Sequence, residues 1–414
     1  MWIPTDAQEI EAAARGGQLN ETSSFDAKAD LPTAKKNIDL ATDVAAMATD
    51  GGVLLYGVGE DEHRNPTIPQ PIVLQGAPER VSQIVSTSIA EVPSIDVRTL
   101  PLEDDPGRGY LAVVVPQSAR APHMVVVNGD NRFYGRGAKG NRILNQGDVA
   151  RLYERRQSWQ IDRLQVLEEA IERAPAPPQD GQSYVHAYAR PVLEQGMFAR
   201  AVGALGGRGQ IHQRLIQCAH GAKLSGIYAP TLEQAHSWRR HNADFWRLST
   251  RDEQFEPVSP DTATQQELVA YIGWLTSLVH LNLYLDGYGR MFCGRASDTR
   301  LADSSTPVLI EVVVGGNVEA FFAIMAMLYE AAGYHGAVDV GVAVTGIKGA
   351  RSERGSRGFD SGPPYPTDRF TRTERVAAGQ LKDADVVAYE LLHDLFDATT
   401  GIEGWNPWTQ PQNR

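Results

Sequence analysis

Cysteine is scarce in this chain of 414 residues, which contains only Cys218 and Cys293. Two cysteines exclude a disulfide-rich scaffold and a zinc module built on clustered cysteines. Residues 1–6 have neither the basic nor the apolar segment of a secretory signal. The longest uninterrupted apolar run, residues 320–328, is too short to span a bilayer. We therefore expect a cytoplasmic protein with no membrane partner.

Nucleotide-binding motifs are also lacking. No Gly-x4-Gly-Lys-Ser/Thr sequence occurs, and Gly57-Val-Gly59 and Gly135-Arg-Gly137 are not dinucleotide fingerprints, so we expect no nucleotide cofactor. The formal net charge of −12 excludes a generally basic nucleic-acid coat protein. Charge is nevertheless uneven, because residues 118–156 contain eight basic and three acidic residues, a local net charge of +5. This segment has the charge that a phosphate backbone would attract.

The chemistry-bearing stretch is residues 21–61, which contains acids and one lysine at the ends of predicted elements. Asp26 and Lys28 are two residues apart, so on a strand both side chains leave the same face. Glu21 lies five residues before Asp26 and would face the other way on a straight strand. A bend at Ser23–Ser24 is needed to bring the two carboxylates together, and serine suits such turns.

The rest of this stretch predicts a helix followed by a buried strand. Residues 33–50 favour a helix with Thr33 as N-cap, because Ile38, Ala41, Val44, Ala45 and Ala48 recur at helical spacing. Gly51 and Gly52 end it, and the apolar run 53–58 is typical of a strand buried on both faces. Glu60 follows this strand, where its carboxylate would emerge beside the first strand.

These motifs resemble a known family. The pattern Glu21-x4-Asp26-x-Lys28, then a helix, then Asp50-Gly-Gly-x-Leu-x-x-Gly-Val-x-Glu60, is similar to the Schlafen-type, AlbA-like (AlbA_2) domain. The segments 115–123 and 131–137 also look similar, so the resemblance covers about residues 5–156. It implies a nucleic-acid-binding module that, in members with the full acidic triad, cuts tRNA and rRNA with a divalent metal.

The resemblance implies roles for four residues. Glu21, Asp26 and Glu60 would be catalytic residues that hold a divalent metal, Mn²⁺ or Mg²⁺, and Lys28 would be the accompanying basic catalytic residue, which contacts the phosphate and stabilises charge that develops on it. Two or three carboxylates can hold such a cation, which polarises a scissile phosphate and activates water. The chain departs from the family in having Asp26-Ala27-Lys28 for Glu-Phe-Lys and Glu60 for Asp. Without the resemblance, a surface ion-pair cluster is the simpler interpretation.

A second predicted site lies in the basic segment. Arg132, Tyr134 and Arg136 alternate along a predicted hairpin strand and would share one face, which suits phosphate contact and base stacking. The alternative is a solvated hairpin and loop. The predicted nucleic-acid-binding residues are Lys28, Arg120, Arg132, Tyr134, Arg136, Lys139 and Arg142.

The predicted fold class is α+β. Residues 1–156 would form a mixed β-sheet module with packed helices, and residues 157–183 a helix and Pro-rich linker. Residues 184–400 would be mostly helical, with a small β-α-β layer formed by 307–314, 318–332 and 337–344, and residues 401–414 a loose tail. In this half, residues 264–285 read as one apolar helix and residues 371–398 as a last helix or pair. Trp238, His241 and Trp246 near Arg239 and Arg240 are either an aromatic-basic patch or the packed side of an amphipathic helix.

The sequence therefore predicts a Schlafen-like, metal-dependent endoribonuclease that acts on tRNA or other structured RNA, in a role such as stress response or phage defence. One alternative is a non-catalytic regulator that binds DNA or RNA through the same surface. Another is an assembly protein whose acidic cluster is merely structural. No second copy of the 21–61 pattern occurs, so a two-lobed clamp would need a homodimer.

Overall fold

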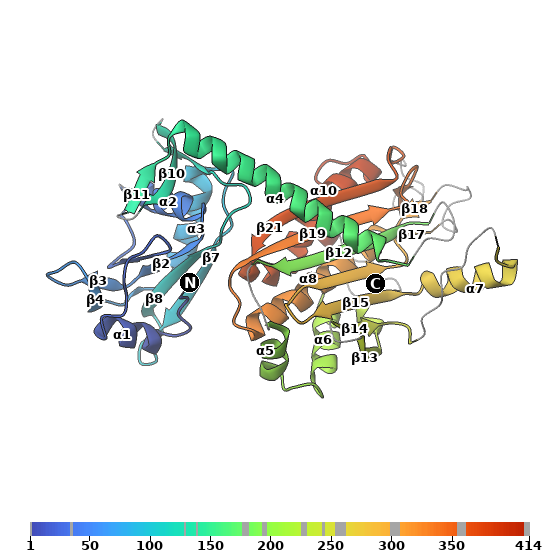
Figure 1. The fold of residues 1–414 in the computed structure, drawn as a ribbon, viewed down its shortest axis with the longest axis horizontal. Helices are drawn as coiled ribbons and strands as arrows, with labels where there is room; N and C mark the ends of the chain where they lie inside the picture. Colours follow the sequence, from blue (N-terminus) through green and yellow to red (C-terminus); the bar gives the residue numbers. More distant parts are fainter. Residues whose placement is uncertain are drawn as a thin grey trace. The chain divides into compact units, whose positions relative to one another are not determined.

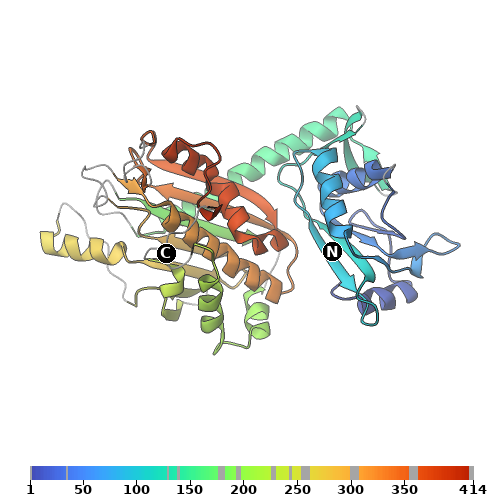
Figure 2. The ribbon, with the colours of Figure 1, turned by 180° about the vertical axis from the view of Figure 1, so that it is seen from behind.

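The computed structural model describes residues 2–33, 36–127, 130–137, 140–175, 182–192, 197–224, 230–241, 245–252, 262–298, 307–353 and 362–409. The chain divides into two compact units (Figures 1 and 2). Unit 1 contains residues 1–161 with the short segments 335–337 and 375–377, and unit 2 contains the remainder. The predicted boundary at residue 156 is close to this division, which falls inside one continuous helix, α4 (Gln146–Glu172).

Unit 1 is built on a five-stranded mixed sheet. Its strands are β1 (Phe25–Lys28), β2 (Gly52–Tyr56), β8 (Arg108–Val115), β5 (Ile72–Val73) and β7 (Asp96–Pro101). They follow the order β1-β2-β8-β5, and β7 also pairs with β8. The pair β1–β2 is parallel, whereas β2, β5 and β7 run antiparallel to β8. Strand β2 is buried along its whole length, as its apolar run predicts.

Helices and smaller sheets surround this sheet. The helices of unit 1 that precede α4 are α1 (Ala7–Arg15), α2 (Asn37–Met47) and α3 (Ala77–Ser88). Strands β11 (Gly140–Ile143), β10 (Asp130–Gly137), β9 (Met124–Val127) and β6 (Ile89–Ala90) form a second sheet, and β3 (Val58–Glu60) pairs with β4 (Pro66–Pro69). Helix α2 begins four residues later than predicted, and its N-cap Lys36 makes no side-chain capping bond, so Thr33 is not the cap.

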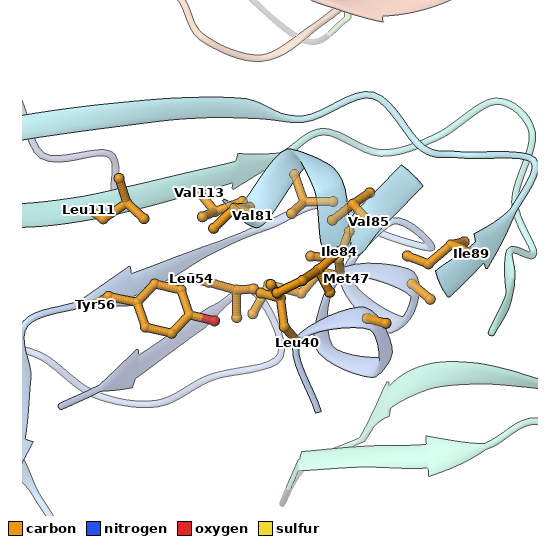
Figure 3. Close-up of a cluster of buried hydrophobic side chains, with 14 of the residues drawn as sticks. Leu40, Met47, Leu54, Tyr56, Val81, Ile84, Val85, Ile89, Leu111 and Val113 are labelled. Atoms are coloured by element: carbon orange, nitrogen blue, oxygen red, sulfur yellow. The ribbon is translucent and has the colours of Figure 1, made fainter. Parts of the chain in front are cut away.

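Each face of the central sheet has its own apolar core, because side chains alternate along a strand. Leu54, Leu111 and Val113 face α2 and α3, where they pack with residues such as Leu40, Met47 and Val81 (Figure 3). The intervening residues Val53, Leu55, Ala112 and Val114 pack with α1 on the other face. The sheet is therefore covered on both faces.

Unit 2 contains a seven-stranded sheet, which the sequence interpretation did not anticipate. Its order is β13 (Ser237–His241), β14 (Phe245–Ser249), β15 (Val279–Tyr284), β16 (Gly289–Cys293), β12 (Tyr184–Pro191), β19 (Ala337–Thr345) and β21 (Arg369–Ala377). The prediction of a mostly helical region is thus wrong, although the α+β class is confirmed. The predicted helix 264–285 is two elements, α7 (Gln265–Leu275) and β15. In β15, Val279, Leu281 and Leu283 alternate with polar residues, a period-two pattern that favours a strand over a helix.

Helices pack on this sheet and on one another. They are α5 (Met197–Ala204), α6 (Ile211–His220), α8 (Glu311–Ala331) and α10 (Ala384–Thr400). Helix α8 is, within the described residues, the one helix long and apolar enough to cross a membrane, but 83% of its most apolar window is buried inside the structure. The buried stretch of α8 extends beyond the apolar run 320–328. The glycines and single polar residues that precede this run in the helix are buried as well. Its burial is that of a core helix in a soluble protein.

Three further expectations for unit 2 are wrong. The predicted strand 307–314 is only β18 (Val308–Leu309), which pairs with β17 (Ser297–Asp298) and β20 (Arg351–Ser352) in a separate small sheet. Since β18 and β19 belong to different sheets, no β-α-β layer forms. Part of the predicted last helix, 371–398, is strand β21. Residues 401–409 are not loose, because Trp405 is buried and Trp408 Nε1 donates a hydrogen bond to Glu319 Oε2 at 2.7 Å.

Candidate functional site

Strand β1 presents the predicted acid and base on one face. Phe25 and Ala27 point into the core on the α1 side of the sheet. Asp26 and Lys28 therefore leave the opposite face, as their spacing predicts. Lys28 is the register partner of Tyr56 on β2, and both residues end their strands. Lys28 therefore lies at one end of the parallel pair β1–β2. Asp26 is buried, and Lys28 is half-buried.

A turn before β1 brings Glu21 to Asp26. The amide of Thr22 donates to the carbonyl of Phe25 at 2.9 Å, and the turn between them occupies Ser23–Ser24, where the sequence required a bend. The pKa of Glu21 is raised by burial and then by the charge of Asp26 and a hydrogen bond with it, while Lys28 opposes the shift. The two carboxyl groups are thus close enough for their charges to interact.

Glu60 reaches the same region from β3. Gly57, with φ of 106°, turns the chain between β2 and β3, and an added Cβ would lie 2.8 Å from the ring of Tyr110. Glu60 ends β3 beside a register irregularity and is exposed. Its charge also raises the pKa of Glu21, but by less than burial or Asp26 does, so Glu60 lies at the margin of the cluster.

Helix α2 adds an acid that the sequence interpretation missed. Lys28 Nζ lies 3.4 Å from Asp26 Oδ2 and 3.4 Å from Asp43 Oδ2. Burial lowers the pKa of Lys28, but the charges of Asp43 and Asp26 outweigh burial and raise it. Burial raises the pKa of Asp43, against the opposing charge of Lys28. The sequence did contain a signal for Asp43, because this acid stands among the apolar residues of an otherwise buried helix.

The hairpin β10–β11 closes the cluster. Arg136 Nη1 donates to Asp26 Oδ2 at 3.1 Å and to Asn141 Oδ1 at 3.1 Å, and its Nη2 donates to the carbonyl of Thr22. Asn141 Nδ2 in turn donates to Asp43 Oδ1 at 2.6 Å. The side chain of Arg136 is only 6% exposed. Arg136 therefore acts within the acidic cluster rather than on the open face of the hairpin.

The other predicted nucleic-acid contacts are dispersed. Arg132 is exposed on β10, and Arg120 is half-buried before β9. Arg142 is about half exposed and pairs with Asp148 at 2.6 Å. Tyr134 packs against the core of unit 1, which leaves less of its ring for base stacking. Lys139 lies outside the described residues.

Two buried polar atoms beside the cluster make no hydrogen bond within the described part of the chain, the Tyr56 hydroxyl and Arg136 Nε. Burial, followed by the charges of Asp43 and Asp26, raises the pKa of Tyr56. Next to the Glu21 turn lies a cavity of about 430 Å³, lined by Trp2, Ala13, Gln18, Leu19, Asn20, Thr22, Ser24 and Phe25. This cavity lies on the α1 side of the sheet with Phe25 in its wall, and no acid of the cluster lines it.

The side chains of the cluster supply only part of the ligands that a hard divalent cation such as Mg²⁺ needs. In the ranges that the structure describes, no group of three His, Cys, Asp or Glu side chains is arranged to hold a metal ion. Glu21 and Asp26 nevertheless form a carboxylate pair whose mutual repulsion a cation would relieve. Mg²⁺ is commonly held by one or two carboxylates, with water and substrate phosphate completing its ligands.

The arrangement can therefore do two kinds of chemistry. Glu21 and Asp26 can bind a cation near a phosphate, and Lys28 can neutralise phosphoryl charge. Alternatively, Lys28 and Arg136 already balance Asp26 and Asp43, as in a structural ion-pair network. No protein-family model and no curated protein sequence matches this chain.

Proposed function

We propose that unit 1 binds RNA and cleaves it with a divalent metal. The observation that carries this proposal is the approach of Glu21 to Asp26, forced by the turn at Ser23–Ser24, with Lys28 on the same face as Asp26. Mutually repelling carboxylates beside a lysine are more useful to a phosphodiester-cleaving site than to stability. The resemblance of residues 5–156 to the Schlafen-type, AlbA-like domain supports the same reaction class.

The proposed roles follow from the contacts. Glu21 and Asp26 would hold Mg²⁺ or Mn²⁺, and Glu60 would stand at the margin of this pair as a third carboxylate. The metal would polarise the scissile phosphate and activate water. Lys28 would stabilise charge that develops on the phosphoryl oxygens. Arg136 would hold the Asp26 carboxylate in place through its 3.1 Å hydrogen bond.

The proposed partner is structured RNA such as tRNA, in the cytoplasm. Arg120, Arg132 and Arg142, with Lys139, belong to the segment of net charge +5 and would contact phosphates. DNA is a second substrate class that the same contacts would accept, because phosphate contacts carry no sugar identity. A role in stress response or phage defence would suit such an enzyme.

A second function, binding without cleavage, is favoured by one observation. Lys28 contacts both Asp26 and Asp43, and Arg136 contacts Asp26, so the buried charges of β1 and α2 are already paired. A paired network holds the hairpin to the sheet without a metal. In that case the basic residues would bind nucleic acid and the acids would be structural.

The test is the incubation of labelled total tRNA with the full chain and Mn²⁺ or Mg²⁺, alongside EDTA and a Glu21→Ala/Asp26→Ala variant. Cleavage that needs both metal and the acids supports the nuclease. Intact tRNA with a salt-dependent gel shift supports the binding protein instead.

A further inference from the structure

One face of the unit 2 sheet carries a row of stacked rings near its edge. His241 and Phe245 are register partners on β13 and β14, and Phe245 is the partner of Tyr284 on β15. The ring centroids of His241 and Phe245 are 5.5 Å apart, and those of Phe245 and Tyr284 are 5.0 Å apart. The ring of Tyr288 continues the row, with its centroid 4.9 Å from that of Tyr284. All four rings are partly exposed.

A row of basic and amide side chains runs beside these rings on the same face. Arg239 is the register partner of Arg247, Arg247 of Asn282, and Asn282 of Arg290, so the four residues cross four neighbouring strands. Arg247 Nε donates to Asn282 Oδ1 at 2.8 Å, and its guanidinium lies 5.6 Å from the ring centre of Phe245. The rings and the guanidinium groups are therefore interleaved.

Arg239 pairs with Asp252 at 3.3 Å, whereas Arg247 and Arg290 have no carboxylate partner among the described residues. Arg290 is 7% exposed and Arg247 is half-buried. Burial and the charge of Arg290 lower the pKa of Arg247, and burial with Arg247 and Arg239 lowers that of His241. Buried charge is costly without a partner, which makes these two guanidinium groups candidate contacts for an anionic ligand.

On the outer part of this face the rings of His241, Phe245 and Tyr284 are partly exposed, whereas Asn282 and Arg290 beside them are buried. Leu283 and Gly289, on the opposite face, lie against α8, where an added Cβ at Gly289 would meet Met325. On the ring face, α4 packs only toward the β12 and β19 end, through Leu167 and Val166 beside Tyr188 and Tyr288 (Figure 1). Strand β13 is the edge strand of the sheet. An extended ligand can therefore reach the rings of β13, β14 and β15 from the edge.

We propose that this face binds single-stranded nucleic acid, with bases stacked on the rings of His241, Phe245 and Tyr284 and phosphates on Arg239 and Arg247. Every base has a π-face, so stacking on aromatic side chains beside arginines accommodates single strands without strict sequence preference. An acidic peptide would use the arginines but would gain little from four aligned rings. The proposal does not depend on cleavage in unit 1.

The test is the fluorescence anisotropy of labelled 12-nucleotide oligo-U and oligo-dT with the full chain in EDTA, across a range of salt. Arg239→Gln/Arg247→Gln should weaken binding and reduce the slope of log affinity against log salt by about 1.4, at about 0.7 per phosphate contact on single strands. Tyr284→Leu should weaken binding by about 5-fold to 150-fold, the range of one lost base stack, and leave the slope unchanged. Tyr284→Phe should retain binding because it keeps the ring.

Matched controls separate this face from general effects. Arg208→Gln removes an exposed charge elsewhere in unit 2, and Tyr389→Leu removes a half-buried ring on α10, so both should leave affinity unchanged. Binding is measured in EDTA, where no metal-dependent cleavage occurs, so failure of the cleavage proposal does not mimic failure here. Should Tyr284→Leu fail to fold, as judged by circular dichroism, Phe245→Leu replaces it. Unchanged affinity in Tyr284→Leu, or equal competition by polyglutamate, would overturn the proposal.

Discussion

Arg136 and Asp26 are 110 positions apart in the chain, yet Arg136 Nη1 lies 3.1 Å from Asp26 Oδ2. Both side chains are almost wholly shielded, at 6% and 9% exposure. The pair fastens the hairpin β10–β11 to the strand that carries the candidate catalytic acid. The packing of the hairpin on the sheet and the position of the Asp26 carboxylate therefore depend on the same pair of side chains.

Removal of this guanidinium should destabilise unit 1. We expect Arg136→Gln to lower the free energy of unfolding by up to about 3–5 kcal/mol, because a buried carboxylate loses the nearer of its two charged partners and keeps only Lys28. Urea denaturation followed by circular dichroism measures this. Arg132→Gln, four residues earlier on the same strand and exposed, should cost less than about 1 kcal/mol. Equal effects of the two variants would mean that the pair with Asp26 is not a major support.

The raised pKa of Glu21 predicts a pH dependence with a defined sign. An acid whose pKa is higher in the folded state binds more protons there, so its contribution to stability falls as pH rises above the ordinary value of 4.5. Glu21→Gln should therefore raise the Tm of the metal-free protein at pH 7, with the gain shrinking toward pH 4.5. Thermal unfolding across this range, with the exposed Glu62→Gln as control, tests it. A lower Tm at pH 7 would contradict the repulsion between Glu21 and Asp26.

His123 should give the opposite slope. Burial lowers its pKa from 6.5 to about 4, and its Nδ1 faces the carbonyl of Glu91, so the folded chain holds it neutral. The unfolded chain binds more protons between these values, so stability should fall as pH is lowered from 6.5 to 4, by up to about 3 kcal/mol for this residue. Urea titrations at pH 7 and pH 4.5 should show a smaller loss in His123→Gln than in the parent. Identical losses would show that His123 does not contribute.

Two tyrosines on neighbouring strands of unit 1 offer a matched comparison. The Tyr56 hydroxyl is buried and has no hydrogen-bond partner in the described ranges, whereas the Tyr110 hydroxyl donates to Glu11 Oε1 at 3.2 Å. Tyr56→Phe should leave stability unchanged or raise it, by at most about 1–3 kcal/mol, because an unsatisfied polar group is removed. Tyr110→Phe should lower it by about 1 kcal/mol or more. Chemical denaturation of both variants decides this, and a loss in Tyr56→Phe would reveal a partner for its hydroxyl.

The sequence was most informative where local pattern decides structure. The spacing of Asp26 and Lys28 placed both on one strand face, and the serines at 23–24 marked the turn that Glu21 needed. Asp43 and Asn141 could not be foreseen, because they meet Lys28 and Arg136 only through the packing of α2 and the hairpin on the sheet. Tyr134 shares the alternation of Arg132 but packs against the core, a result of tertiary packing rather than spacing.

The second half of the chain was harder to interpret, since its strands contain polar residues at buried positions. Asn282 and Arg290 are buried on the ring face of the unit 2 sheet, so their strands do not present a simple apolar face. Trp238, His241 and Trp246, read as one side of a helix or as a patch, lie on the edge hairpin β13–β14. A period-two alternation in residues 279–284 was present and favoured a strand, but the long apolar context masked it.

The central claim is that Glu21 and Asp26 form a metal-dependent site for RNA cleavage. Its most direct test is the rate of tRNA cleavage at fixed Mn²⁺ for the parent, the near-isosteric variants Glu21→Gln and Asp26→Asn, and Glu62→Gln, an exposed acid outside the cluster. We expect cleavage by the parent and by Glu62→Gln, none in EDTA, and a loss of at least about 100-fold in the two cluster variants, at the scale of losing one electrostatic contact in a transition state. Equal cleavage by all four proteins, or no cleavage by the folded parent with metal, would contradict the claim.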